Sequence, residues 1–174
     1  MINHYINYIK TYGNINEKLI LKIWHNCQLH NINLLVSAYL IYKFTKNCII
    51  TIKNFNLIIV TSLILSNKSF DDQCYTLKTW QTILSNSGMD LPLSILNQLE
   101  QVFLSSINYD INYTKIQSDS LFLKCCDSEL LSLILPQNNQ YLPLSPISLF
   151  GDTDDNLGML TPISLFKNSP VWLK

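Results

Sequence analysis

Residues 57–72 read LIIVTSLILSNKSFDD, and the first part of this stretch decides the fold class. The run Leu57–Leu65 is apolar on nearly every side of a helix, which is typical of a helix surrounded by other helices. Its β-branched residues would also suit a buried strand, and periodicity alone does not separate the two structures. The length of the run and the helical patterns around it favour a helix that follows Asn56.

Two amphipathic segments precede this run. The first extends from Ile15 to Cys27, and Asn14 and Glu17 have the spacing of a capping box at its start. A second predicted helix follows Asn33 and extends to Phe44. The apolar residues of the first segment fall on one helical face: Leu19, Ile20, Ile23, Trp24 and Cys27.

Further helical patterns follow the run. One helix is predicted to begin near Thr76 and to end before Gly88, a residue that favours helix ends. The next has Asp90 as a candidate cap and Pro92 near its first turn. A weaker helical pattern covers Ser118–Leu135. Because no strand–helix alternation is seen, we predict an all-α protein, a five-helix bundle over residues 15–125.

Composition divides the chain near Pro136. Five of the six prolines lie after Leu135, so we predict a helical domain over residues 1–135 and an irregular Pro- and Ser-containing tail over 136–174. Formal net charge is zero and the chain contains no Arg, which disfavours nucleic-acid binding. The N-terminus does not have the pattern of a signal peptide, and the longest apolar stretch, 49–65, is too broken to favour a membrane span. An odd number of cysteines without framework spacing suits a reducing, intracellular compartment.

Several motifs resemble the cyclin box, in the order that this family shows. Ser62–Asp72 resembles the end of its third helix, with a small–small–Lys pattern followed by an aromatic residue and Asp. Tyr75–Trp80 resembles the start of the fourth helix of fungal Pho/Pcl-type cyclins. Leu96–Leu104, followed by Tyr109–Ile111, resembles the fifth helix and its exit, and Ala38–Phe44 fits the second helix. The resemblance covers roughly residues 15–125.

Departures from the family narrow the subtype. Lys43 stands where the family often has Arg, the first helix lacks the Met-Arg signature of mitotic cyclins, and no second cyclin box is seen. The last two points favour the shorter Pho/Pcl type. The resemblance implies a regulatory subunit that binds and activates a cyclin-dependent kinase as a heterodimer in the nucleus or cytoplasm, without a cofactor, metal or catalysis of its own.

The same resemblance implies a kinase-binding surface. Lys68 and Glu100 correspond to the family's Lys and Glu that contact the kinase backbone, whereas the residues alone would also suit two solvated charges. The resemblance makes Asp72 a contact to a basic kinase residue. Phe70 and Tyr75 beside it are candidate interface aromatics, although each would also suit the core.

Other chemistry receives less support. Asp71 and Asp72 could serve acid–base catalysis only in a cleft that matches their pKa values, and otherwise suit a loop after a helix. His25, Cys27 and His30 supply too few ligands for a zinc site. We therefore expect a kinase activator first. The alternative is a cyclin-fold scaffold that binds other proteins without activating a kinase, and an enzyme is the third and least supported hypothesis.

The tail contains a short internal repeat. The sequence LSPISLF at 144–150 recurs as LTPISLF at 160–166, which suits either two similar turns or a pair of linear motifs. Each copy has a Ser/Thr-Pro dipeptide that a proline-directed kinase could modify, and a third one follows. The predicted phosphorylation sites are Ser145, Thr161 and Ser169.

Overall fold

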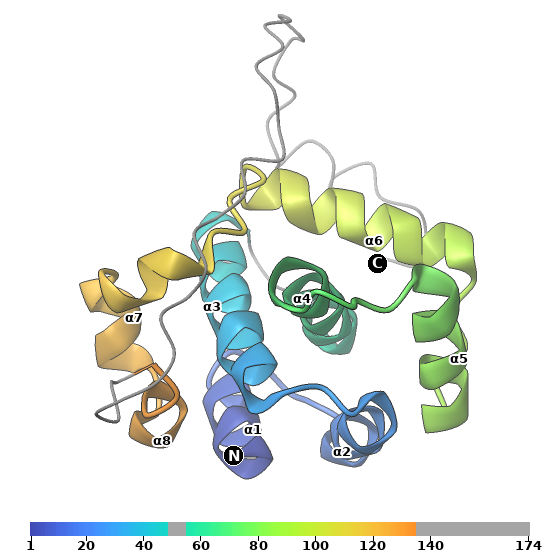
Figure 1. The fold of residues 1–174 in the computed structure, drawn as a ribbon, viewed down its shortest axis with the longest axis horizontal. Coiled ribbons are helices and arrows are strands. Elements are labelled where there is room, and N and C mark those ends of the chain that lie inside the picture. The colour runs from blue at the N-terminus through green and yellow to red at the C-terminus, as the bar shows by residue number, and fades with distance from the viewer. Residues whose placement is uncertain (49–54, 135–174) are drawn as a thin grey trace, which may run out of the picture.

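The computed structural model of the chain describes residues 1–48 and 55–134 (Figure 1). This part is built from helices and contains no strand, which confirms the all-α prediction. None of its helices is long and apolar enough to cross a membrane. In chain order the elements are α1 (Ile2–Lys10), α2 (Glu17–Cys27), α3 (Asn31–Asn47), α4 (Phe55–Phe70), α5 (Leu77–Ser87), α6 (Leu93–Ser106), the 3₁₀ helix η2 (Tyr113–Gln117), α7 (Ser120–Cys125) and α8 (Ser128–Leu131).

Helix α4 lies at the centre of the bundle. Figure 1 views it nearly end-on, with α3 on one side, α5 on the other, α6 above, and α1 and α2 below. Helices α3 and α6 pack directly against it. Ile59, Val60 and Leu63 are fully or almost fully buried, as are the small polar residues Ser62 and Ser66. The predicted helix over Leu57–Leu65 is therefore confirmed and is longer than its apolar run, because the polar turn 66–70 continues it.

Two predicted helix caps are wrong. Asn16 rather than Asn14 caps α2, because its side-chain oxygen accepts a hydrogen bond from the Leu19 backbone N–H at 3.1 Å. Glu17 reaches back to Lys10 on α1 at 2.8 Å instead of closing a capping box. Asp90 accepts a hydrogen bond from the Ser85 hydroxyl, and Pro92 occupies the N-cap position of α6.

The ends of α5 match the prediction. The Thr76 hydroxyl accepts a hydrogen bond from the Thr79 backbone N–H at 3.2 Å. Gly88 ends the helix with a φ of 95°, a left-handed conformation that a residue without a Cβ adopts at low cost. Both ends of α5 are thus fixed by local chemistry.

Helix α1 was not predicted. Tyr5, Ile6 and Ile9 bury one of its faces, at a helical spacing that is visible in the sequence. The Tyr5 hydroxyl hydrogen-bonds Ser37 on α3 at 2.8 Å, and Ser37 hydrogen-bonds Ser62 on α4 at 2.6 Å. This buried chain of hydroxyls ties α1 to the bundle centre, so α1 is an additional helix beside the predicted five.

The weak helical pattern over Ser118–Leu135 is two short helices, α7 and α8. Asp119 and Asp127 cap them, and each cap interrupts a continuous helix. Phe122 is fully buried and makes ring contacts with Tyr39 and Tyr42 of α3, which places α7 over this side of the bundle. The predicted boundary near Pro136 lies outside the described residues.

Candidate functional site: the ion pair and the α4–α5 connection

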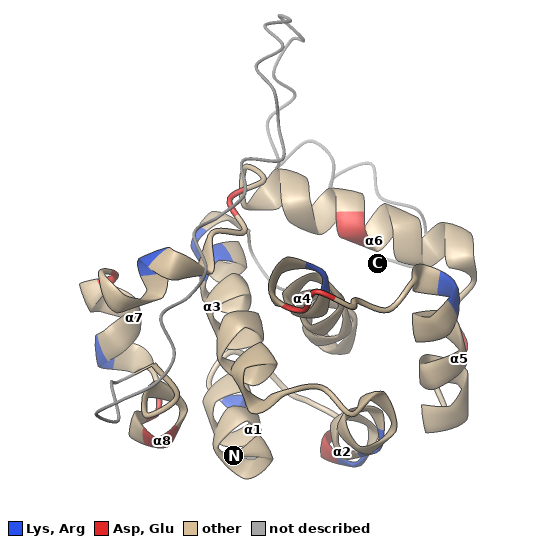
Figure 2. Ribbon diagram, viewed as in Figure 1, with Lys and Arg blue, Asp and Glu red and all other residues tan. Residues whose placement is uncertain are grey.

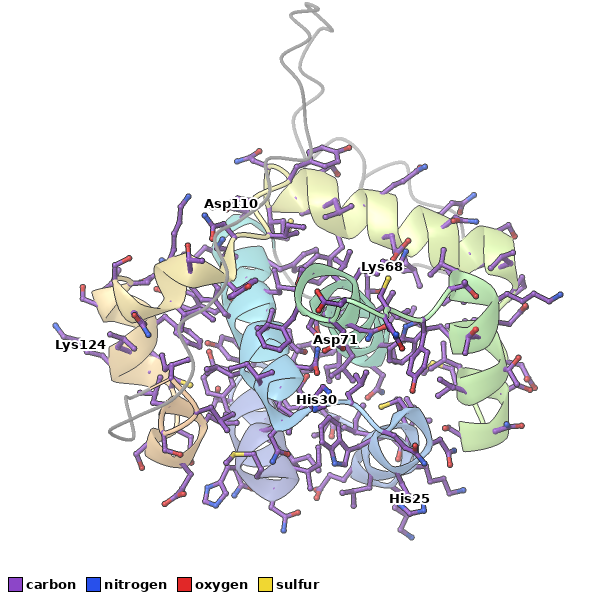
Figure 3. All side chains as sticks on the ribbon, in the orientation of Figure 1. His25, His30, Lys68, Asp71, Asp110 and Lys124 are labelled. Atoms are coloured by element: carbon purple, nitrogen blue, oxygen red, sulfur yellow. The ribbon has the colours of Figure 1, made fainter. Side chains whose placement is uncertain are left out.

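Lys68 and Glu100 form an ion pair that joins two helices. The Lys68 Nζ atom lies 2.6 Å from Glu100 Oε1 and 2.8 Å from Oε2. Figure 2 shows a basic band at the near end of α4 and an acidic band on α6, and Figure 3 labels Lys68 on the side of α4 toward α6. The two residues that the resemblance assigns to the kinase-binding surface therefore contact each other, and their contact with a kinase stays a prediction.

Glu100 is the more deeply buried partner of this pair. Leu96, Leu99 and Phe103 pack into the bundle from α6, and Glu100 lies beside them on the same helix. The Glu100 side chain is consequently only 12% exposed, whereas Lys68 is 33% exposed. A carboxylate at this depth needs a cationic partner, and Lys68 supplies it while staying open to solvent on its outer side.

The connection from α4 to α5 continues this surface. Phe70 is exposed at the end of α4, with its ring 5.5 Å from that of Tyr113 on η2. Asp72 is exposed, and Tyr75 is half-buried with its ring 6.2 Å from that of Trp80. Four predicted site residues, Lys68 included, therefore lie in the last turn of the central helix and in the short connection that follows it.

Two buried amides support this segment, and the sequence analysis did not identify them. Asn67 donates to the Asp71 carboxylate at 2.6 Å and accepts from the Tyr75 backbone N–H at 2.9 Å. Asn33 on α3 also donates to Asp71, at 3.1 Å. Asn33 is predicted to precede a helix but lies inside α3, and an Asn inside an apolar helix is a signal of a buried polar contact.

An open pocket of about 420 Å³ lies between the α4–α5 connection and the α2–α3 connection. Figure 3 shows Asp71 and His30 on this side of the molecule, below Lys68. Its lining contains two carboxylates and no Lys, so the pocket suits a cationic group. The lining residues are Gln28, Leu29, His30, Asn67, Phe70, Asp71, Asp72, Gln73 and Tyr75.

The other predicted chemical groups are not assembled. Asp71 is held by two amides while Asp72 is exposed, so the two do not form a shared acid–base pair. Cys27 is fully buried, whereas His25 and His30 are exposed. Within residues 1–48 and 55–134, no three His, Cys, Asp or Glu side chains are placed to hold a metal ion. Ser145, Thr161 and Ser169 lie outside the described residues.

Lys43 has a structural partner. Its Nζ atom contacts the Asp110 carboxylate at 3.0 Å and the Asp110 backbone oxygen at 2.8 Å, which ties α3 to the connection after α6. Burial lowers the pKa of the Lys43 ammonium, and the hydrogen bond to Asp110 opposes this shift. Burial alone would raise the pKa of the Asp110 carboxyl, but hydrogen bonds from Lys43 and Lys115 outweigh it and hold that pKa below its usual value.

The family model described as "Cyclin, N-terminal domain" matches residues 10–112, which is more than half of the chain. The chain belongs to the cyclin family. Proteins of this family are regulators, generally of protein kinases, and are not themselves catalysts. The match begins at the end of α1, covers α2–α6 and ends before η2, so in this cyclin the elements η2, α7 and α8 lie outside the matched domain. No curated protein and no solved structure gives a significant match.

Proposed function

We propose that this cyclin is the regulatory subunit that binds and activates a cyclin-dependent protein kinase, as a heterodimer in the nucleus or cytoplasm. The observation that carries the proposal is the Lys68–Glu100 pair across α4 and α6, because a partly buried pair at this point has an exposed surface directly beside it. The pair offers a cationic donor and an anionic acceptor whose geometry is set by two packed helices. Such a pair can fix the register of a second chain.

The α4–α5 connection supports the same surface. Phe70 and Tyr75 present aromatic area, which is enriched at the centres of interfaces. Asp72 and the acidic pocket suit a basic side chain of the kinase. Contacts of this kind would favour one arrangement of the kinase's active-site helix, so that binding shifts a two-state equilibrium toward the active form.

We further propose that the kinase is of the type that pairs with fungal Pho/Pcl cyclins. The support is the resemblance of Tyr75–Trp80 and Leu96–Leu104 to that group. The proposal of activation does not depend on this subtype, because the same surface would serve any kinase with a complementary basic residue.

The test begins with recovery of the tagged full chain from cells that produce it, followed by mass spectrometry of the bound proteins. A cyclin-dependent kinase is expected in stoichiometric amount. The purified kinase should then phosphorylate a substrate peptide faster when the cyclin is added. A Pho/Pcl-type kinase and a cell-cycle kinase assayed in parallel separate the subtype from the general function. A bound kinase whose activity the cyclin leaves unchanged would contradict activation.

A further inference from the structure

The Asn67 side chain connects three separate parts of the chain. It lies in the last turn of α4 and is 2% exposed. Its Nδ2 atom donates to Asp71 at 2.6 Å, and its Oδ1 atom accepts from the Tyr75 backbone N–H at 2.9 Å and from the Trp80 indole N–H at 3.4 Å. One amide therefore binds the beginning of the α4–α5 connection, its end, and the helix that follows.

Asn33 completes this arrangement from another helix. Its Nδ2 atom donates to the same Asp71 oxygen at 3.1 Å, so two amides from α3 and α4 hold one carboxylate. The Asn33 Oδ1 atom is fully buried and has no hydrogen-bond partner among the described residues. A buried oxygen without a partner lowers stability, so the net contribution of Asn33 depends on the bond to Asp71.

These contacts give the adjacent residues Asp71 and Asp72 different surroundings. Asp71 is bound by both amides and faces the bundle, whereas Asp72 is exposed and has no hydrogen bond or ion pair within residues 1–48 and 55–134. The segment 71–75 contains no helix or strand that could order it by backbone bonding alone. Its conformation therefore depends on the side chains that hold its two ends.

We propose that Asn67, together with Asn33, is a positioning residue for kinase binding. The two amides order the α4–α5 connection before the kinase arrives, so that Asp72 and Tyr75 are already placed at the pocket that both line. Ordering a segment in advance removes an entropic cost that binding would otherwise carry. This inference rests on the proposed function, because it assumes that a kinase binds this surface.

The first part of the test uses the free full-length chain. In Asn67→Ala, the amide of Tyr75 and the indole N–H of Trp80 should shift in the ¹H–¹⁵N spectrum, and residues 71–75 should show increased motion in ¹⁵N relaxation. Ser66→Ala is the matched control, because Ser66 is equally buried on α4 and its hydroxyl bonds only the Leu63 carbonyl of its own helix. Unchanged order in Asn67→Ala would overturn the proposal.

The second part measures the affinity for the kinase that the wild-type chain recovers. Asn67→Ala is expected to weaken binding about tenfold, and Ser66→Ala less than about twofold. Asn67→Ala and Asp72→Asn combined should weaken binding by clearly less than the product of their separate effects, because one acts through the other. Losses that multiply would indicate that Asn67 contributes stability only, and would overturn the proposal.

Asn33→Leu keeps the test valid if Asn67→Ala fails to fold. Leu removes the buried oxygen that has no partner, so stability should be unchanged or higher, while kinase binding falls about threefold. Equal binding by Asn33→Leu and wild type would overturn the role of Asn33. A wild-type chain that binds no kinase would contradict the proposed function itself, and normal wild-type binding without loss in the variants would contradict only this inference.

Discussion

The ammonium of Lys68 contacts both carboxylate oxygens of Glu100, at 2.6 Å and 2.8 Å, and so connects the last turn of α4 to the middle of α6. The two partners differ in burial, since Glu100 is 12% exposed and Lys68 is 33% exposed. Removing the lysine leaves a partly buried carboxylate without a partner, whereas removing the carboxylate leaves an ammonium that can turn toward water.

The first prediction concerns this asymmetry. Lys68→Met should lower the free energy of unfolding by about 1–3 kcal/mol, because an unpaired buried carboxylate is costly. Glu100→Gln should cost less, about 1 kcal/mol, because the remaining ammonium is solvated. Urea unfolding of both variants provides the measurement. Equal stability of Lys68→Met and wild type would show that the pair has no role in the fold.

The second prediction concerns the central helix. Ile59→Asp should prevent folding, because Ile59 is fully buried and a charge there has no partner. Leu93→Asp is the control: Leu93 is 39% exposed at the start of α6, where a negative charge is favourable. Far-UV circular dichroism with thermal melting distinguishes the two. A cooperative, wild-type-like melt of Ile59→Asp would contradict the central position of α4.

The third prediction is a loss of stability in alkali. Burial raises the pKa of the Cys27 thiol to about 11 and that of Cys126 to about 12. A thiol in the unfolded chain has a pKa of about 8.5. Because the folded state favours the protonated form, this stability is complete below about pH 8.5 and is lost as the pH rises toward the folded-state values.

Cys27 alone should account for a loss of order 2 kcal/mol between about pH 9 and 11. The measurement is the free energy of unfolding across this range in a non-oxidising buffer, with Cys27→Ala as the comparison. The slope against pH should be shallower in Cys27→Ala than in wild type. Parallel slopes would mean that Cys27 is ionised as easily in the folded chain as in the unfolded one.

The sequence could predict the helices whose apolar faces point one way, and the central helix, which is apolar all round. It also indicated Lys68 and Glu100, although by resemblance to a family rather than by spacing, since the two residues are far apart in the chain. Helix α1 carries an equally readable pattern in Tyr5, Ile6 and Ile9, but no side-chain cap marks its start.

The capping errors have a different origin. Asn14, Asn16 and Asp90 are all chemically suited to cap a helix, and the choice among them depends on contacts with distant residues. The Asn16 backbone N–H, for example, donates to the Asn56 side chain on α4 at 3.0 Å. The amide contacts of Asn33 and Asn67 likewise become visible only once three helices are placed together. Local sequence does not show which distant residues such contacts join.

The fourth prediction concerns the tail. We propose that Ser145, Thr161 and Ser169 are modified by the active kinase, because each precedes a proline. Phosphate adds about −1.5 to −2 charges at neutral pH, and a chain without Arg has only Lys to pair with it. Mass spectrometry after incubation with the active kinase should find phosphate at these positions. Its absence from all three would contradict this proposal.

The most direct test of the central claim is kinase binding by the charge-swapped variant Lys68→Glu/Glu100→Lys. The pair can re-form with its charges exchanged, so the melting temperature should stay close to that of wild type. At position 100 a hydrogen-bond donor would then replace the Glu100 carboxylate, the acceptor that the kinase meets in the wild-type protein. Titration calorimetry against the recovered kinase should show affinity reduced more than about tenfold, with stimulation of the kinase lost in parallel. Wild-type affinity in a folded charge-swapped variant would contradict the assignment of this surface to kinase binding.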